Sequence, residues 1–165
     1  MMILVLMSEE EAEKRKLKPL GRIIATSDVA VDPTYFTIAS SEVILKVIEK
    51  ANEKNLYARK LKLEDIDFFD IHEAFSSIVI IASERYGIPI HKINKHGSSV
   101  ALGHPAGMTG TRVLQSLLTV LKVHGAKLGI AATCNGGGNK IYFLAFCFIQ
   151  IFLGGGCAIL VERIY

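Results

Sequence analysis

The feature that most restricts the fold is an alternation of short apolar runs with longer helical patterns along the chain. Ile66–Ile71 and Leu128–Thr133 have the length and the apolar, β-branched composition of buried strands. The segment after Gly110 places apolar residues at helical spacing from Val113 to Leu121. Because strands that alternate with helices fold into layered domains, the sequence predicts an α/β domain with a mixed sheet covered by helices.

Further elements follow from the same patterns. Ile3–Met7, Gly21–Thr26 and Cys157–Ile164 are predicted strands. Ser40 is the predicted N-cap of a helix. A second predicted helix over Ala74–Tyr86 is apolar on almost all sides, which is typical of a central, buried helix. One face of the helix after Ser40 carries Val43, Ile44, Val47, Ile48 and Ala51.

Composition limits the class of protein. The chain has 165 residues, 50% of them hydrophobic, which suffices for one domain, over residues 1–165, with a substantial core. The formal net charge is +3 with acidic and basic residues interspersed, so we expect no nucleic-acid partner and no polybasic membrane patch. The cysteines Cys134, Cys147 and Cys157 form no CxxC pattern, which favours a reducing compartment over a disulfide framework.

Three reactive side chains stand at the ends of predicted elements: His72 after a strand, His104 before a helix and Cys134 after a strand. Ligands of layered α/β domains collect where strands end, so we expect these groups to share one edge. A histidine at a helix entrance suits acid–base chemistry, and a cysteine before glycines suits a thiolate beside free backbone N–H groups. Taken singly, Cys134 also fits a small buried hydrophobe, and His72 fits a histidine bonded to a carbonyl. A zinc site lacks the usual ligand spacing, and no metal is expected.

Several spaced blocks together resemble the C-terminal half of the thiolase family. These are His72-Glu73-Ala74-Phe75, Ala101-Leu102-Gly103-His104-Pro105 with Gly107 and Gly110, and Cys134-Asn135-Gly136-Gly137-Gly138, in that order. The segments 4–10 and 32–37 are also similar to regions of that family. The last two blocks are most similar to short-chain acetoacetyl-CoA thiolases, which are acetyl-CoA acetyltransferases.

The resemblance implies acyl transfer between CoA thioesters, in either the condensing or the thiolytic direction. By this match His104 activates the nucleophile and helps to line an oxyanion hole. Cys134 removes the α-proton of the second thioester, and Gly136 offers its backbone N–H to a second oxyanion hole. His72 stands where most short-chain members have an asparagine that orients a water. Histidine occurs there in the long-chain branch, so the preferred acyl chain length stays open.

The same resemblance implies a substrate pocket and a metabolic setting. Phe36, Ala101 and Leu102 fall in the region of the CoA-thioester pocket. CoA thioesters are then substrates, with no tightly bound cofactor, and the full-length family forms homo-oligomers and serves fatty acid metabolism. Family members are mitochondrial, peroxisomal or cytosolic, which leaves the compartment of this chain open. Membrane association is not expected.

One departure from the family pattern concerns the nucleophile. The family's nucleophilic cysteine belongs to an N-terminal half, and every cysteine of this sequence lies at or after the Cys134 block. Three functions therefore stay open: an enzyme part that needs its other half, a non-catalytic CoA-binding or partner-pairing half-thiolase, and a membrane-tethered remnant.

A second departure is an apparent apolar insertion over residues 139–153. The family passes directly from one glycine run into its last strand, whereas this chain repeats a glycine triplet on both sides of the apolar run. We interpret the run as foreign to the fold, such as translated intron or a gene-model error. It is too short to span a membrane; extended to Val161 it reaches the length, but Gln150 and the glycines weaken that reading.

Overall fold

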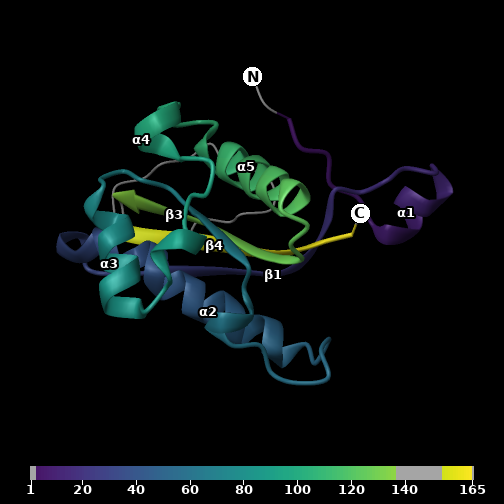
Figure 1. The fold of residues 1–165 in the computed structure, drawn as a ribbon, viewed down its shortest axis with the longest axis horizontal. Coiled ribbons are helices and arrows are strands. Elements are labelled where there is room, and N and C mark those ends of the chain that lie inside the picture. The colour runs from purple at the N-terminus through teal and green to yellow at the C-terminus, as the bar shows by residue number, and fades with distance from the viewer. Residues whose placement is uncertain (1–2, 137–153, 165) are drawn as a thin grey trace.

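The computed structural model describes residues 3–136 and 154–164. Its centre is a four-stranded sheet in the order β1-β4-β3-β2 (Figure 1). The strands are β1 (Gly21–Ala30), β2 (Phe68–Ile71), β3 (Leu128–Gly136) and β4 (Gly154–Arg163). β2 pairs with β3 in parallel, whereas β4 pairs antiparallel with both β3 and β1. The sheet is therefore mixed, and the predicted α/β class is confirmed.

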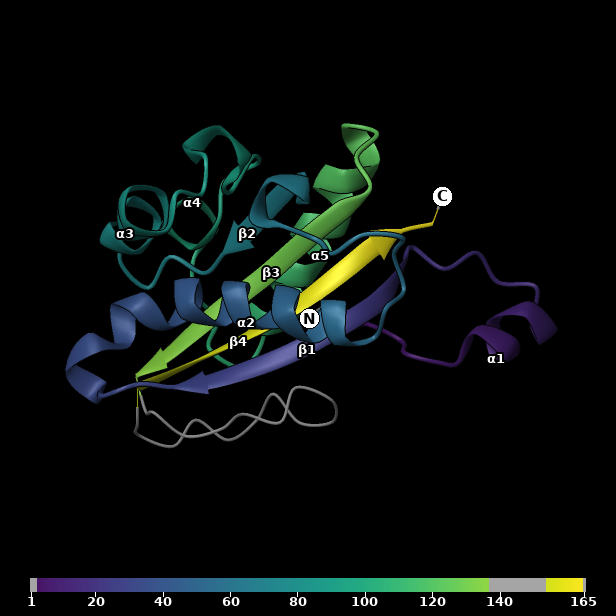
Figure 2. The same cartoon turned by 90° about the horizontal axis from the view of Figure 1, so that it is seen from below.

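Two long helices cover opposite faces of the sheet (Figures 1 and 2). α2 (Ala39–Glu53) packs on the face that carries Ile130 and Ala132, and α5 (Thr109–Val123) packs on the face of Ala131. Because successive side chains of a strand point to opposite faces, this alternation produces two separate apolar clusters. The predicted helix faces are buried: Val43, Ile44, Val47, Ile48 and Ala51 on α2, and Val113, Leu114, Leu117 and Leu121 on α5.

Shorter elements connect these layers. α1 (Glu9–Lys14) precedes β1, α3 (Ser77–Tyr86) contacts α2, and α4 (Ser99–Leu102) lies before α5. Three 3-10 helices span Pro33–Ile38, Leu63–Asp65 and Ile90–Lys92. The whole connection between the parallel strands β2 and β3 therefore contains α3, α4 and α5.

Two predictions at the start of the chain are wrong. Residues 3–7 form neither helix nor strand, and Val5 is 76% exposed, because no described strand lies beside them. α2 begins at Ala39, so Ser40 lies inside the helix and is not its N-cap. The 3-10 helix from Pro33 runs directly into α2, and Asp32 caps that earlier helix by accepting a hydrogen bond from the Thr34 N–H.

The prediction of a central, buried helix over Ala74–Tyr86 is also wrong. The helix starts at Ser77, and only Ile78 and Ala82 of it are buried, whereas Ile80 is 52% exposed. Within the described residues α3 packs mainly against α2 and the 3-10 helices Pro33–Ile38 and Ile90–Lys92. An apolar sequence on all sides does not by itself supply the neighbours that would bury it.

The apparent insertion, 139–153, lies outside the described residues. The strands on either side of it are adjacent, and their pairing runs from Leu128 opposite Glu162 to Gly136 opposite Gly154. No helix in the described parts of the chain is both long and apolar enough to cross a membrane.

We predict that deletion of residues 139–156, which leaves one glycine triplet before Cys157, preserves the fold. The pairing of Thr133 with Cys157 can persist, because a short glycine-containing loop suffices to join two antiparallel strands. Circular dichroism should show the same strand content, with a melting temperature within a few degrees of the parent chain. Replacing 139–153 by a Gly/Ser linker of equal length is the control, and loss of cooperative melting in the deletion variant alone would contradict the prediction.

Candidate active site at the carboxyl ends of β2 and β3

The parallel pairing of β2 with β3 brings two of the predicted site residues to one edge of the sheet. Ile71 lies opposite Ala132, and the His72 N–H continues the ladder by donating to the Ala132 carbonyl at 2.9 Å. Cys134 follows Ala132 by two residues on β3, and Gly136 is the last residue of that strand. The predicted placement of His72 and Cys134 at neighbouring strand ends is therefore confirmed.

His104 lies at the same edge, just after the C-terminal end of α4. Its ring centroid lies 4.3 Å from that of His72, with 37° between the ring planes. Gly103 ends α4 with φ +86° and ψ 172°, a conformation that is open to glycine and strained for other residues. The chain therefore turns sharply just before His104, which is exposed beside the buried ring of His72.

The hydrogen-bond network assigns the tautomer of His104. Its Nδ1 lies 2.7 Å from the Thr109 hydroxyl, which itself donates to the Pro105 carbonyl at 3.2 Å. Because that hydroxyl has one hydrogen, it accepts from Nδ1–H of His104. In the neutral imidazole Nε2 is then the unprotonated nitrogen, which is the form of a general base.

His72 differs from His104 in burial and charge. It is 2% exposed, and its Nδ1 lies 2.6 Å from the Ser99 hydroxyl. Burial, with further contributions from the nearby His104 and Arg112, lowers the pKa of His72 to about 4. The ring is therefore neutral at physiological pH and can exchange hydrogen bonds without carrying charge.

Cys134 is half-buried and packs on the α2 side of the sheet. Burial raises the pKa of its thiol, while the neighbouring Ser40 hydroxyl lowers it. That hydroxyl makes no hydrogen bond of ordinary geometry within the described residues, so the effect of burial on the thiol is the larger one. The thiol therefore holds its proton near neutral pH, and once deprotonated it is a stronger base than an exposed thiolate.

The predicted pocket residues lie near this edge. Phe36, on the 3-10 helix before α2, packs edge-to-face on Phe75 at 5.9 Å between centroids, three residues after His72. Ala101 and Leu102 are exposed on α4, directly before the Gly103 turn.

Asn94 and Glu73 are structural parts of the site that sequence reasoning missed. The Asn94 side chain accepts from the Ile71 N–H at 2.7 Å and donates to the Ile71 carbonyl at 3.0 Å. The Glu73 carboxylate accepts from the Asn94 amide at 2.8 Å and from the Val100 N–H at 2.9 Å. These bonds tie the end of β2 to α4, and no local sequence pattern marks Asn94 for this role.

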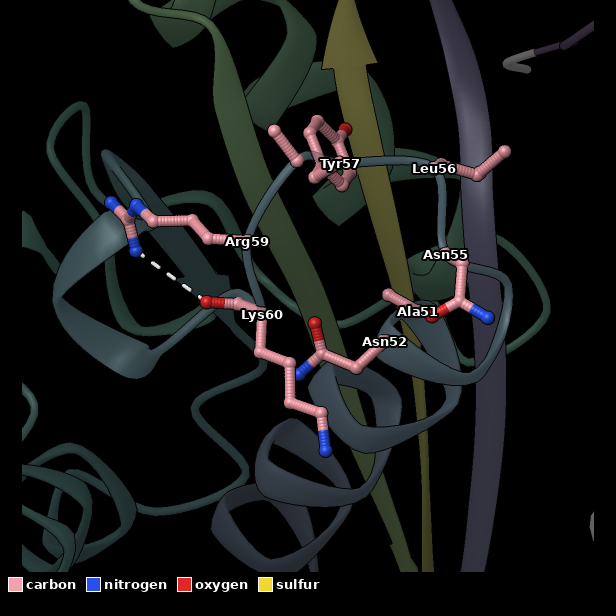
Figure 3. Close-up of a pocket in the computed structure, with 8 residues that line it drawn as sticks. Ala51, Asn52, Asn55, Leu56, Tyr57, Arg59 and Lys60 are labelled. Carbon is pink, nitrogen blue, oxygen red and sulfur yellow. Dashed lines mark hydrogen bonds between the residues drawn. The ribbon is translucent and has the colours of Figure 1, made fainter.

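Other parts of the described structure offer less chemistry. Figure 3 shows a pocket at the C-terminal end of α2, away from the strand ends, lined by Asn52, Tyr57, Arg59 and Lys60 among others. None of the predicted site residues lines it, and Arg59 is bound to Asp65. Within residues 3–136 and 154–164, no group of three His, Cys, Asp or Glu side chains could hold a metal ion.

Comparison with known proteins places this geometry in context. The family model described as "Thiolase, C-terminal domain" matches residues 17–145. The chain is 40% identical to acetyl-CoA acetyltransferase of Candida albicans over 136 residues, 82% of this chain and 32% of that protein. It is 42% identical to the mitochondrial acetyl-CoA acetyltransferase of Rattus norvegicus over 135 residues, 82% of this chain and 30% of the relative.

Solved structures agree with these sequence matches. Bacillus anthracis acetyl-CoA acetyltransferase superposes with a TM-score of 0.78 at 35% identity, covering 96% of this chain and 34% of that one. Human mitochondrial 3-ketoacyl-CoA thiolase in complex with CoA superposes with a TM-score of 0.78 at 27% identity, covering 95% and 34%. The chain thus spans about a third of the length of the relatives that it matches.

We predict that Thr109→Val lowers the free energy of unfolding by about 1–2 kcal/mol, because it removes the hydroxyl shared by His104 and Pro105 without changing the side-chain shape. Thr119→Val is the matched control: Thr119 lies on the same helix and donates to the Gln115 carbonyl at 2.9 Å, with no histidine attached. Urea unfolding measures both variants. Equal losses would contradict a specific contribution from the His104 contact.

We predict that His72→Asn reduces the loss of stability in acid. The pKa of His72 is about 4 in the folded chain, against an ordinary value of 6.5. Between these values His72 binds more protons in the unfolded chain, so its contribution to stability falls as the pH falls from 6.5 to 4, by roughly 3 kcal/mol at most.

Urea unfolding at pH 6.5 and 4.5 measures this effect. The His72→Asn variant should lose less stability between the two pH values than the parent chain. A His91→Asn variant, at an exposed histidine, should behave like the parent. The prediction fails when all three proteins lose the same amount.

Proposed function

Because the chain belongs to the family of thiolase C-terminal domains, we propose that it carries the acid–base part of acyl transfer between CoA thioesters. The specific reaction proposed is that of an acetyl-CoA C-acetyltransferase, run either as condensation or as thiolysis. The observation that carries the proposal is that His72 and His104 lie together at the edge of the sheet where β3, which carries Cys134, ends. CoA thioesters are the proposed substrates, with no tightly bound cofactor.

In the first half-reaction, His104 takes the proton of a nucleophilic thiol. Its Nε2 is free for this because Nδ1 is bound to Thr109. The thiolate attacks the carbonyl carbon of an acyl-CoA, and the bond to the CoA sulfur then breaks. The departing CoA thiolate takes the proton of the Cys134 thiol and leaves as CoA thiol, so Cys134 becomes a thiolate. His72 and the backbone around it offer hydrogen bonds to the thioester oxygen while it carries negative charge.

In the second half-reaction, the Cys134 thiolate removes a proton from the methyl carbon of acetyl-CoA. The carbanion attacks the acyl-enzyme carbonyl, a carbon–carbon bond forms and the bond to the enzyme sulfur breaks. His104 returns its proton to the released enzyme thiolate. The Gly136 N–H is the proposed donor to the enolate oxygen. A half-buried thiol of raised pKa suits this step, because its conjugate base is strong.

The nucleophilic cysteine itself is proposed to come from residues outside this sequence. Cys134 has the acid–base role, Cys157 is 4% exposed beside the Thr133 hydroxyl at 2.9 Å, and Cys147 lies outside the described residues. The chain spans about a third of its relatives' length, which leaves room for that cysteine in a covalently linked or separate partner.

A partner-pairing role without catalysis has one observation in its favour. Large apolar side chains around the two histidines are exposed: Phe75 by 59%, Val100 by 70% and Leu102 by 56%. Such a surface suits contact with another protein segment. The experiment below separates this role from catalysis.

We predict that the chain catalyses exchange of the acetyl protons of acetyl-CoA with D₂O, a partial reaction that needs the Cys134 base and no nucleophile. Proton NMR of the acetyl methyl group measures the rate. Cys134→Ser should slow exchange by at least about 100-fold, the usual range for loss of a positioned base. His91→Asn, at an exposed residue, should leave it unchanged.

Exchange at the buffer rate, combined with retained CoA binding in equilibrium dialysis, would contradict the catalytic proposal. That result would favour the non-catalytic, partner-pairing role.

A further inference from the structure

A buried polar network lies behind the two histidines. Asp70 from β2, Ser98 from the segment before α4, and Arg112 from α5 are 2%, 0% and 4% exposed. The Ser98 hydroxyl donates to the Asp70 carboxylate at 2.9 Å. One nitrogen of Arg112, Nη2, lies 3.2 Å from the Ser98 oxygen and 2.7 Å from the Ser99 oxygen.

The direction of each hydrogen bond follows from the groups themselves. A guanidinium only donates, so both serine oxygens accept from Arg112. The hydrogen of Ser98 goes to Asp70. Among the described residues the Ser99 hydroxyl has two partners, Arg112 Nη2, which only donates, and His72 Nδ1 at 2.6 Å, so its hydrogen is assigned to the bond with Nδ1. Nδ1 of His72 is therefore unprotonated, and the ring hydrogen lies on Nε2.

The two neighbouring imidazoles are thus held in opposite tautomers. The Thr109 hydroxyl donates to the Pro105 carbonyl and accepts from Nδ1–H of His104, so Nε2 of neutral His104 is unprotonated. The Ser99 oxygen accepts from Arg112, and the Ser99 hydroxyl donates to Nδ1 of His72. The ring hydrogen of His72 is therefore on Nε2.

Stability alone does not account for Arg112. Its Nε and Nη1 have no hydrogen-bond partner within the described residues although the side chain is buried. Burying a cationic group with unpaired donors costs free energy. In this buried position Arg112 donates hydrogen bonds to Ser98 and Ser99, and Ser99 contacts His72.

We propose that Arg112 and Ser99 are positioning residues, which act through His72 by fixing it as the Nε2–H tautomer and so make it a hydrogen-bond donor to the thioester oxygen. That the acceptor is the thioester oxygen rests on the proposed function, whereas the tautomer of His72 does not depend on it. A histidine in this form presents an N–H group, as a side-chain amide would, so it can replace the asparagine that the sequence resemblance places at position 72.

The test is a long-range proton–nitrogen NMR correlation of the ¹⁵N-histidine-labelled 165-residue chain at pH 7. His72→Asn and His104→Asn identify the two sets of ring signals by their disappearance. In the parent chain His72 should show an unprotonated Nδ1 and a protonated Nε2, and His104 the reverse.

Substitutions then test the cause. Ser99→Asp supplies a carboxylate that only accepts, so His72 should switch to the Nδ1–H tautomer while Arg112 keeps a partner. Ser99→Thr keeps the hydroxyl and should keep the Nε2–H tautomer. Ser98→Ala removes a hydroxyl from the same network without touching His72 and should also leave the tautomer unchanged.

Should Ser99→Asp fail to fold, Ser99→Ala provides the second variant, in which the Nδ1 signal should move to the position of a nitrogen with no hydrogen bond. A protonated Nδ1 on His72 in the parent chain, or an unchanged His72 spectrum in every folded Ser99 variant, overturns the proposal. If the tautomers are as expected but the chain does not catalyse proton exchange, the proposed function is refuted and the positioning role stands.

Discussion

The parallel pairing of β2 with β3 is the constraint on which the candidate site depends. It aligns the carboxyl ends of the two strands, so His72 and Cys134 share an edge without any direct bond between them. It also forces the chain to cross back over the sheet between these strands, since parallel neighbours cannot be joined by a tight turn. The crossing segment contains α4 and α5, and the turn between them delivers His104 to the same edge.

That edge is assembled from buried polar groups with opposite responses to pH. Burial raises the pKa of Asp70 to about 7, against the lowering effects of Ser98 and Arg112. Its contribution to stability is complete below the ordinary carboxyl pKa of 3.8 and is lost as the pH rises through about 7. The contribution of His72 has the other sign, since the neutral ring is favoured as the pH rises from about 4 to 6.5. Between about pH 4 and 6.5 the changes in stability from Asp70 and His72 offset each other. The net pH dependence of the chain's stability is therefore smaller than either contribution alone.

The sequence was sufficient for features set by local periodicity. The buried faces of α2 and α5 repeat at helical spacing, and the strand before His72 and the strand that carries Cys134 are short and apolar. It was insufficient where the outcome depends on neighbours. Residues 3–7 are apolar enough for a strand but have no described strand beside them. Ser40 is not a helix N-cap because a 3-10 helix runs directly into α2 before it. Asn94 and Arg112 carry no local signal, because their partners are distant in sequence.

The deepest limit of sequence reasoning concerns the two histidines. As residue types they are identical, and both bind a hydroxyl through Nδ1 at nearly equal distance, 2.6 Å for His72 and 2.7 Å for His104. What distinguishes the proposed donor from the proposed base is the group that binds each hydroxyl on its other side. A carbonyl takes the hydrogen of Thr109, whereas a guanidinium fills the oxygen of Ser99. The proposed roles of the two histidines therefore depend on the groups that bind those hydroxyls, the Pro105 carbonyl and the Arg112 guanidinium.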